Sequence, residues 1–263
     1  MFFLPLFDDN PIKKIPWVTY IIIGLNVLVF LFQSSLSGSE LEIFFRENGF
    51  ISGEFFSNSS LLYSNLYTSL FIHGGFFHLF SNMLYLWIFG DNIEAELGSI
   101  KFLIFYLVCG VIASLAQGIV DPDSLIPLIG ASGAVAGILG AYLILYPSAN
   151  VRVFVWIFIF IQIINVPAGI VLAIWIIGQF FSLGSSMSDG VAYMAHVAGF
   201  MSGLMYMFLF RKRDKVQSTH HSRPFTRTSF KEAYDQKIYD RSKSKGIKDY
   251  LSLIHISEPT RRS

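Results

Sequence analysis

Residues 130–140 read GASGAVAGILG, a run of glycine, alanine and other apolar residues around one serine. In a helix, Ser132, Ala136 and Gly140 share one face, because they follow an i, i+4, i+8 pattern. Faces built of such small residues allow two helix backbones to approach closely inside a membrane. The run therefore predicts a short helix that packs tightly against another helix.

A second small-residue face lies farther along the chain. His196, Gly199 and Gly203 follow an i, i+3, i+7 pattern and share a helix face. If the two faces meet, the hydroxyl group of Ser132 and the imidazole of His196 come within hydrogen-bonding reach. Both helices are predicted to run from the outside to the inside. Ser132 and His196 both lie near the start of their helices, so they can lie at a similar depth in the membrane.

The composition places these helices in a membrane. The chain has 263 residues, of which 53% are hydrophobic and only 14% charged, whereas soluble domains average about 25% charged. Residues 1–210 hold five basic and twelve acidic side chains, and residues 211–263 hold fourteen basic and six acidic ones. So few charges in residues 1–210 exclude a soluble globular enzyme and indicate an integral membrane domain. The single Cys109 excludes a disulfide framework and a cysteine-based metal site.

The C-terminal residues form a separate, polar segment. Residues 211–250 are basic and lack apolar periodicity, so we predict a disordered cytoplasmic tail. Its charge favours anionic membrane lipid over nucleic acid as a partner. Residues 251–261 read LSLIHISEPTR, which resembles the translation of a transposase sequencing adaptor. We therefore leave residues 251–263 out of the functional argument.

Six apolar segments are predicted to cross the bilayer, which takes roughly 20 apolar residues per helix. Pro167 divides an uncharged stretch that is too long for one helix, so we interpret Val153–Ile164 as an interfacial or re-entrant segment. Residues 37–72 are predicted to form a long, structured first loop in the membrane interface. The fold class is therefore an all-α membrane protein, a bundle of six transmembrane helices. The predicted spans are Trp17–Leu36, Phe77–Gly90, Phe102–Val120, Ser132–Tyr146, Pro167–Leu183 and Val191–Phe210.

The basic residues predict the orientation. If the N-terminus is cytoplasmic, the lysines and arginines of the loops fall on the cytoplasmic side, and only Arg46 lies outside. No small-residue cleavage site follows the first apolar segment, so we expect a retained helix rather than a signal peptide. We predict a multi-pass protein of the plasma (inner) membrane with both termini in the cytoplasm.

Placing a polar side chain inside a membrane span costs free energy, so polar residues there often have a functional role. A serine in hydrogen-bonding reach of a histidine is the simplest activated nucleophile, which indicates Ser132 as nucleophile and His196 as general base. Two structural roles compete with this interpretation. Ser132 suits a helix N-cap, and His196 could instead join two spans through a hydrogen bond.

His78 and Asn82 are spaced i, i+4, so both project from one face of the second span. Acyl transfer needs hydrogen-bond donors aimed at the developing oxyanion, and an imidazole and a side-chain amide can both donate. Structural hydrogen bonding is the alternative role for this pair. We interpret His73, just before the second span, as structural, fixing the loop against that span.

Together these motifs resemble the rhomboid family of intramembrane serine proteases. The matching segments are HGGFFHLFSN at 73–82, GASG at 130–133 and AHVAG at 195–199, with the family-like EAELGS at 94–99. The resemblance covers residues 1–210. It implies a six-helix bundle with a half-embedded first loop, a Ser132–His196 dyad without an acidic third member, and an oxyanion hole of His78, Asn82 and the Ser132 amide. It also places Gly130, Gly133 and Gly199 near the site as structural residues.

The sequence departs from the family pattern at one position. Some members carry an aromatic residue four positions after the serine, which packs against the catalytic imidazole, whereas this chain has Ala136 there. The resemblance therefore does not indicate which side chain packs against His196.

The predicted function is an intramembrane serine endopeptidase that needs no cofactor or metal. Its substrates would be single-pass or other transmembrane proteins, cleaved at segments that unwind easily, because helical carbonyls in lipid are hydrogen-bonded and dry. One alternative is a catalytically silent rhomboid-like protein that binds membrane proteins. Another is a small-solute transporter with the buried histidines as a proton relay, although we find no inverted repeat to support it.

Overall fold

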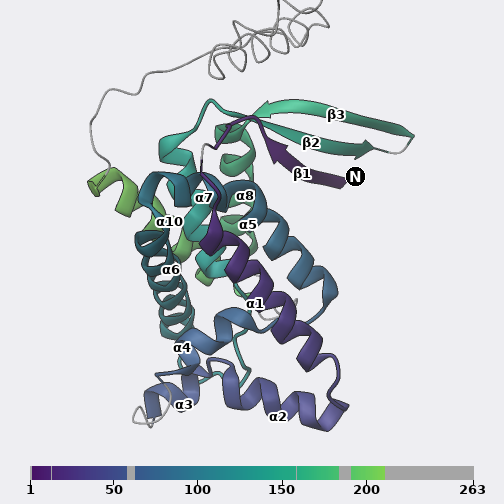
Figure 1. Cartoon of the computed structure of the whole chain (residues 1–263). Coiled ribbons are helices and arrows are strands. Elements are labelled where there is room, and N and C mark those ends of the chain that lie inside the picture. The colour runs from purple at the N-terminus through teal and green to yellow at the C-terminus, as the bar shows by residue number, and fades with distance from the viewer. Residues whose placement is uncertain (1, 13, 58–62, 158, 184–190, 211–263) are drawn as a thin grey trace, which may run out of the picture. The chain divides into compact units, whose positions relative to one another are not determined.

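The computed structural model describes residues 2–12, 14–57, 63–157, 159–183 and 191–210, and the predicted tail at 211–250 and the adaptor-like residues 251–263 lie outside this range. Six helices of 14 to 22 residues form a bundle in the described part of the chain (Figure 1). They are α1 (Trp17–Gln33), α5 (Phe76–Leu97), α6 (Ser99–Val120), α7 (Ser132–Leu145), α8 (Ala168–Ser182) and α10 (Tyr193–Phe210).

These helices coincide with the six segments predicted from the apolar runs, so the helical assignments are confirmed. By length and composition, α6 and α10 are long and apolar enough to cross a membrane, while α1, α7 and α8 are shorter apolar helices. The number of crossings stays a prediction. The largest difference is in α5, which continues to Leu97 rather than ending near Gly90. Its polar last turns remain helical because the side chains of Asn92 and Glu94 are buried and hydrogen-bonded.

Helix α7 lies in the core, and its small face meets that of α10. Ten residues of α7, from Gly133 to Tyr142, are buried. A Cβ atom added to Gly203 would lie 1.8 Å from the carbonyl oxygen of Gly137, and one added to Gly199 would lie 2.1 Å from that of Gly133. The two backbones are therefore in direct contact, and Ala136 and Gly140 of the predicted face also lie against α10, near Gly199 and Phe200.

A buried carboxylate joins α5 to the start of α1. Glu94 accepts hydrogen bonds from the backbone N–H groups of Val18, at 3.0 Å, and Thr19, at 2.8 Å. It also accepts bonds from the hydroxyl groups of Thr19 and Ser99. The first N–H groups of a helix lack partners within the helix and carry partial positive charge. Glu94 supplies the cap that Pro16, at the N-cap position of α1, cannot provide.

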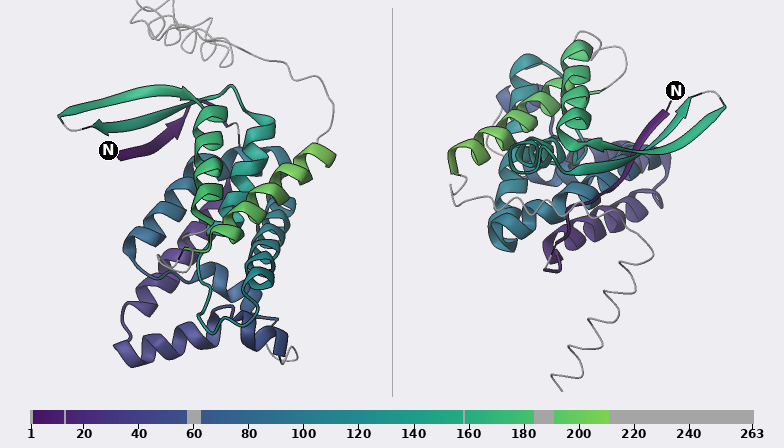
Figure 2. Two further views of the ribbon diagram at one scale, coloured as in Figure 1. Left: turned by 180° about the vertical axis from the view of Figure 1, so that it is seen from behind. Right: turned by 90° about the horizontal axis from the view of Figure 1, so that it is seen from above.

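A three-stranded antiparallel sheet corrects the all-α prediction. Its strands are β1 (Phe2–Asp8), β2 (Asn150–Ile157) and β3 (Phe160–Pro167), in the order β1-β2-β3. The uncharged segment Val153–Ile164, interpreted as interfacial or re-entrant, forms most of the β2–β3 hairpin. Valine, isoleucine, phenylalanine and tryptophan are abundant there, and these residues favour strands. Figures 1 and 2 show the hairpin projecting from the end of the bundle where α1 begins.

Short helices fill the first loop at the opposite end of the bundle (Figure 1). They are α2 (Gly38–Asn48), α3 (Ser52–Ser57), α4 (Asn65–Thr68) and the 3₁₀ turn η1 (Ser69–Phe71). Ser37 and Glu40 form a capping box at the start of α2. These elements lie in the described parts of the loop, and a structured first loop in the membrane interface remains a prediction.

Close contact between α7 and α10 predicts that Gly203→Ala is strongly destabilising. The added methyl group meets backbone rather than a flexible side chain, so the helices must separate, at a cost of about 3 kcal/mol. We expect a clearly lower thermal midpoint (Tm) in detergent. Gly24→Ala is the control, because a Cβ atom there meets nothing within 4 Å. Equal Tm values for the two variants would contradict the observed crossing.

Asp8, at the end of β1, generates a pH prediction. Its carboxylate accepts hydrogen bonds from the Tyr142 hydroxyl and from Asn92 Nδ2, at 3.0 Å. Burial, reinforced by the nearby carboxylates of Asp91 and Asp9, raises the pKa of Asp8 from 3.8 to about 7. The folded state therefore binds a proton more tightly than the unfolded state, and stability falls as pH rises from about 4 to 7.

Asp8→Asn keeps an oxygen acceptor for Asn92 and Tyr142 but cannot ionise. We expect a Tm in detergent that is roughly 2–4 °C higher than wild type at pH 8, with a smaller difference at pH 5. The exposed Asp123→Asn serves as the control. If the Tm difference between Asp8→Asn and wild type is the same at pH 5 and pH 8, the raised pKa of Asp8 is refuted.

Candidate active site

Ser132 and His196 are brought together by the crossing of α7 and α10. Ser132 is the first residue of α7, and His196 lies in the first turn of α10. The distance between Ser132 Oγ and His196 Nε2 is 2.9 Å, a hydrogen-bonding distance. Both side chains are partly buried. Ser132 makes no side-chain cap for α7, so the capping alternative receives no support.

The other ring nitrogen of His196 contacts a residue that the sequence analysis missed. Gln179 Oε1, from α8, lies 2.6 Å from His196 Nδ1. The ring of Trp175, also on α8, lies with its centroid 5.8 Å from the imidazole centroid. Gln179 is a polar side chain in an apolar helix, and such residues are costly in membranes. That signal was present in the sequence and could have identified it.

These contacts show which side chains surround His196 when position 136 is alanine. Ala136 is fully buried between α7 and α10, 3.3 Å from a Cβ atom added to Gly199. Aromatic contact with the imidazole comes instead from Trp175 of α8 and from Tyr193 of α10, whose ring meets it edge-on at 6.3 Å.

His78 and Asn82, from α5, lie near the loop that precedes the serine. The loop residue Gly130 has φ +126°, a conformation that favours glycine. A Cβ atom there would lie 2.7 Å from His78 Nε2, so the loop before Ser132 lies against this imidazole. Asn82 Nδ2 donates to the His78 carbonyl oxygen at 2.9 Å. An amide group has two N–H bonds, so this contact leaves one of them for another acceptor.

His73 has the contacts of a structural residue. Its backbone N–H group donates to Gln33 Oε1 at 3.3 Å, and its carbonyl oxygen accepts a bond from Gln33 Nε2. The ring is fully buried and meets the His78 ring edge-on, with centroids 5.0 Å apart. Burial lowers the pKa of His73 to about 3, so the ring is neutral. The loop is thus fixed to α1 by hydrogen bonds and to α5 by ring contact.

A cavity of about 1010 Å³ connects these residues. Ser132, His196, His78 and Asn82 all line it, together with Trp175. Further polar groups reach it from α5 and α6, namely Ser81, Ser114 and Gln117. These polar groups give a mostly apolar lining several positions that can form hydrogen bonds with water or a peptide.

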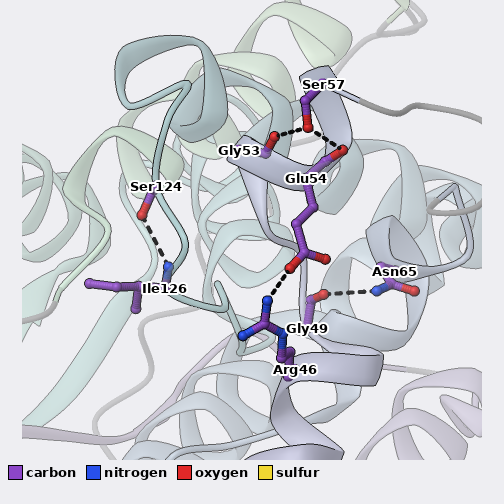
Figure 3. Close-up of polar contacts among 8 residues, drawn as sticks. All are labelled: Arg46, Gly49, Gly53, Glu54, Ser57, Asn65, Ser124 and Ile126. Carbon is purple, nitrogen blue, oxygen red and sulfur yellow. Dashed lines mark hydrogen bonds and ion pairs between the residues drawn. The ribbon is translucent and has the colours of Figure 1, made fainter.

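The loop between α6 and α7, which also borders the cavity, is held to the first loop. Phe50 and Leu128 exchange backbone hydrogen bonds of 3.0 and 2.8 Å, and Gly53 N–H donates to the Ser124 carbonyl oxygen at 2.9 Å. Figure 3 shows the adjoining polar contacts, including the 2.7 Å ion pair between Arg46 and Glu54 that links α2 to α3. The two loops therefore form one hydrogen-bonded border around the cavity.

Comparison with known proteins identifies the family. The model of the Rhomboid domain matches residues 61–213, more than half of the chain. The chain belongs to the rhomboid family. Membership makes it a membrane protein, in agreement with its composition.

Several curated rhomboids are similar to this family member. Rhomboid protein 1, mitochondrial, of Saccharomyces cerevisiae is 31% identical over 159 residues, which are 57% of this chain and 42% of the relative. Rhomboid protease GluP of Bacillus subtilis is 37% identical over 134 residues, 49% of this chain and 24% of the relative. Putative rhomboid protease YdcA, also of Bacillus subtilis, is 26% identical over 198 residues, 75% of this chain and 90% of the relative. This rhomboid thus spans less than half the length of the first two relatives.

Proposed function

We propose that this rhomboid is an intramembrane serine endopeptidase that cleaves transmembrane segments of other membrane proteins. One observation carries the proposal: Ser132 Oγ lies 2.9 Å from His196 Nε2 in a cavity that His78 and Asn82 also line. Relatives named as rhomboid proteases support the same reaction class.

The reaction follows from these groups. His196 Nε2 accepts the hydroxyl proton while Ser132 Oγ attacks the carbonyl carbon of the scissile peptide bond. The resulting oxyanion is stabilised by N–H donors from His78, Asn82 and the Ser132 backbone. His196 then donates the proton to the departing amine, which leaves an acyl ester on Ser132. Water from the cavity, deprotonated by His196, hydrolyses this ester and restores the hydroxyl group.

The membrane limits which substrates can react. Backbone carbonyls of a transmembrane helix are hydrogen-bonded within the helix, so the cleaved segment must unwind to place a carbonyl carbon near Ser132. Glycine, proline or other weak helix formers near the bond favour unwinding. We expect single-pass or other transmembrane proteins as substrates, which enter the site from the surrounding lipid. The enzyme is expected in the plasma (inner) membrane, with both of its termini in the cytoplasm.

Replacement of either member of the dyad should abolish cleavage. We expect Ser132→Ala and His196→Ala to lower the cleavage of a reconstituted single-pass substrate roughly 10³-fold or more, with Tm close to wild type. Labelling of wild type by a fluorophosphonate should depend on Ser132. Ser202→Ala is the matched control, because that hydroxyl group bonds Gly199 O of its own helix, at 2.7 Å, and the side chain of Cys109, neither of which belongs to the proposed dyad.

Retained cleavage in Ser132→Ala would overturn the proposal. A wild type that cleaves none of several substrates and takes up no fluorophosphonate would instead support a silent, binding-only rhomboid.

Loss of an oxyanion donor should lower kcat with little change in KM. We expect Asn82→Ala to reduce kcat by about 10²-fold, because the donor acts on charge that exists only in the transition state. Asn48→Ala is a matched control, since Asn48 Nδ2 makes the same type of bond, 3.0 Å to the Phe44 carbonyl four residues earlier. A KM increase at constant kcat would assign Asn82 to substrate binding instead.

A further inference from the structure

We propose that Gln179 is a positioning residue that holds the His196 imidazole in the form able to act as a base. This inference rests on the proposed function and adds a third residue to the Ser132–His196 pair. It is carried by the 2.6 Å contact between Gln179 Oε1 and His196 Nδ1.

The contact selects one tautomer of the imidazole. An amide oxygen can only accept a hydrogen bond, so the proton of the neutral ring lies on Nδ1. Nε2 then carries the lone pair that faces Ser132 Oγ at 2.9 Å. The opposite tautomer would place a proton between Nε2 and the serine, and the ring could not accept the hydroxyl proton.

The geometry of α8 explains why Gln179 reaches the ring. Trp175 and Gln179 are four residues apart and share one helix face. Trp175 contacts the imidazole and also the Phe200 ring of α10, with centroids 6.1 Å apart. The indole thus packs beside the imidazole while the amide bonds its far nitrogen, so one face of α8 fixes both the position and the tautomer of His196.

The amide is neutral, which distinguishes this arrangement from a carboxylate triad. An aspartate or glutamate would stabilise the imidazolium through charge as well as through the hydrogen bond. Among the described residues, His78 of α5 acts electrostatically on the imidazole, and the ring of Tyr193 of α10 contacts it; both side chains are titratable. Neither side chain carries a negative charge at neutral pH. A carboxylate at position 179 would therefore add a new negative charge beside the imidazole.

Two substitutions test the inference in the full-length protein. Gln179→Met removes the acceptor with little change in volume, and Gln179→Glu keeps an oxygen acceptor but adds a charge. Gln162→Met is the matched control, because Gln162 is exposed on β3. The readouts are the fluorophosphonate labelling rate, kcat and KM for a reconstituted transmembrane substrate, and Tm, each measured from pH 5 to 9.

We expect Gln179→Met to lower the labelling rate and kcat about tenfold or more, with KM and Tm close to wild type. Gln179→Glu should recover the rate at high pH. The acidic limb of its kcat/KM profile should shift to higher pH by about one unit, because the carboxylate favours the protonated ring. That shift tests the contact between position 179 and the imidazole, whereas a purely structural glutamine would lower Tm in Gln179→Met without a selective loss of kcat.

Wild-type rates in Gln179→Met, or an unshifted profile in Gln179→Glu, would overturn the inference while leaving the proposed function intact. If Gln179→Met fails to fold, the profile of Gln179→Glu decides. A wild type that neither cleaves nor labels at Ser132 would overturn both proposals.

Discussion

The backbones of α7 and α10 cross so closely that no side chain fits at Gly140, Gly199 or Gly203, and the rest of the site depends on this contact. Cβ atoms at Gly140, Gly199 and Gly203 would each lie about 2 Å from a carbonyl oxygen of the partner helix. Within lipid there is no hydrophobic force that pulls one apolar helix toward another, so such close packing is a main source of association. Because Ser132 begins one helix and His196 lies in the first turn of the other, the crossing also sets the separation of Ser132 Oγ and His196 Nε2.

Two further contacts of the His196 imidazole come from a different helix. Gln179 and Trp175 both belong to α8; Gln179 contacts Nδ1 of the ring, whereas Ser132 contacts Nε2. The packing of α7 against α10 therefore brings the serine and histidine together, while residues of α8 contact the imidazole. Small residues suit the first task because they allow approach, and large or polar residues suit the second because they fill space and form directed bonds.

Much of this arrangement was predictable from the sequence. The six long helices follow the apolar runs, and helical spacing shows which small residues share a face, whereas the structure shows that the two faces meet. The sheet was missed because an uncharged stretch in a membrane protein was interpreted without weighing its β-branched and aromatic residues, and because β1 lies about 150 residues away from its partner β2. Pairing between distant strands leaves little local signal. The roles of His78 and Asn82 remain predictions, since lining a shared cavity does not by itself establish an oxyanion hole.

The sequence by itself determined the membrane character, the helix positions and the choice of Ser132 and His196, because charge depletion and residue spacing are local properties. The tertiary structure decided what orients His196. With Ala136 in place of an aromatic residue, no nearby part of the chain indicated a replacement. Gln179 reaches the ring only because α8 packs beside α10, and the packing of helices depends on the shapes of whole faces rather than on any one motif. The capping of α1 by Glu94, 75 residues away from Thr19 in the chain, was decided in the same way.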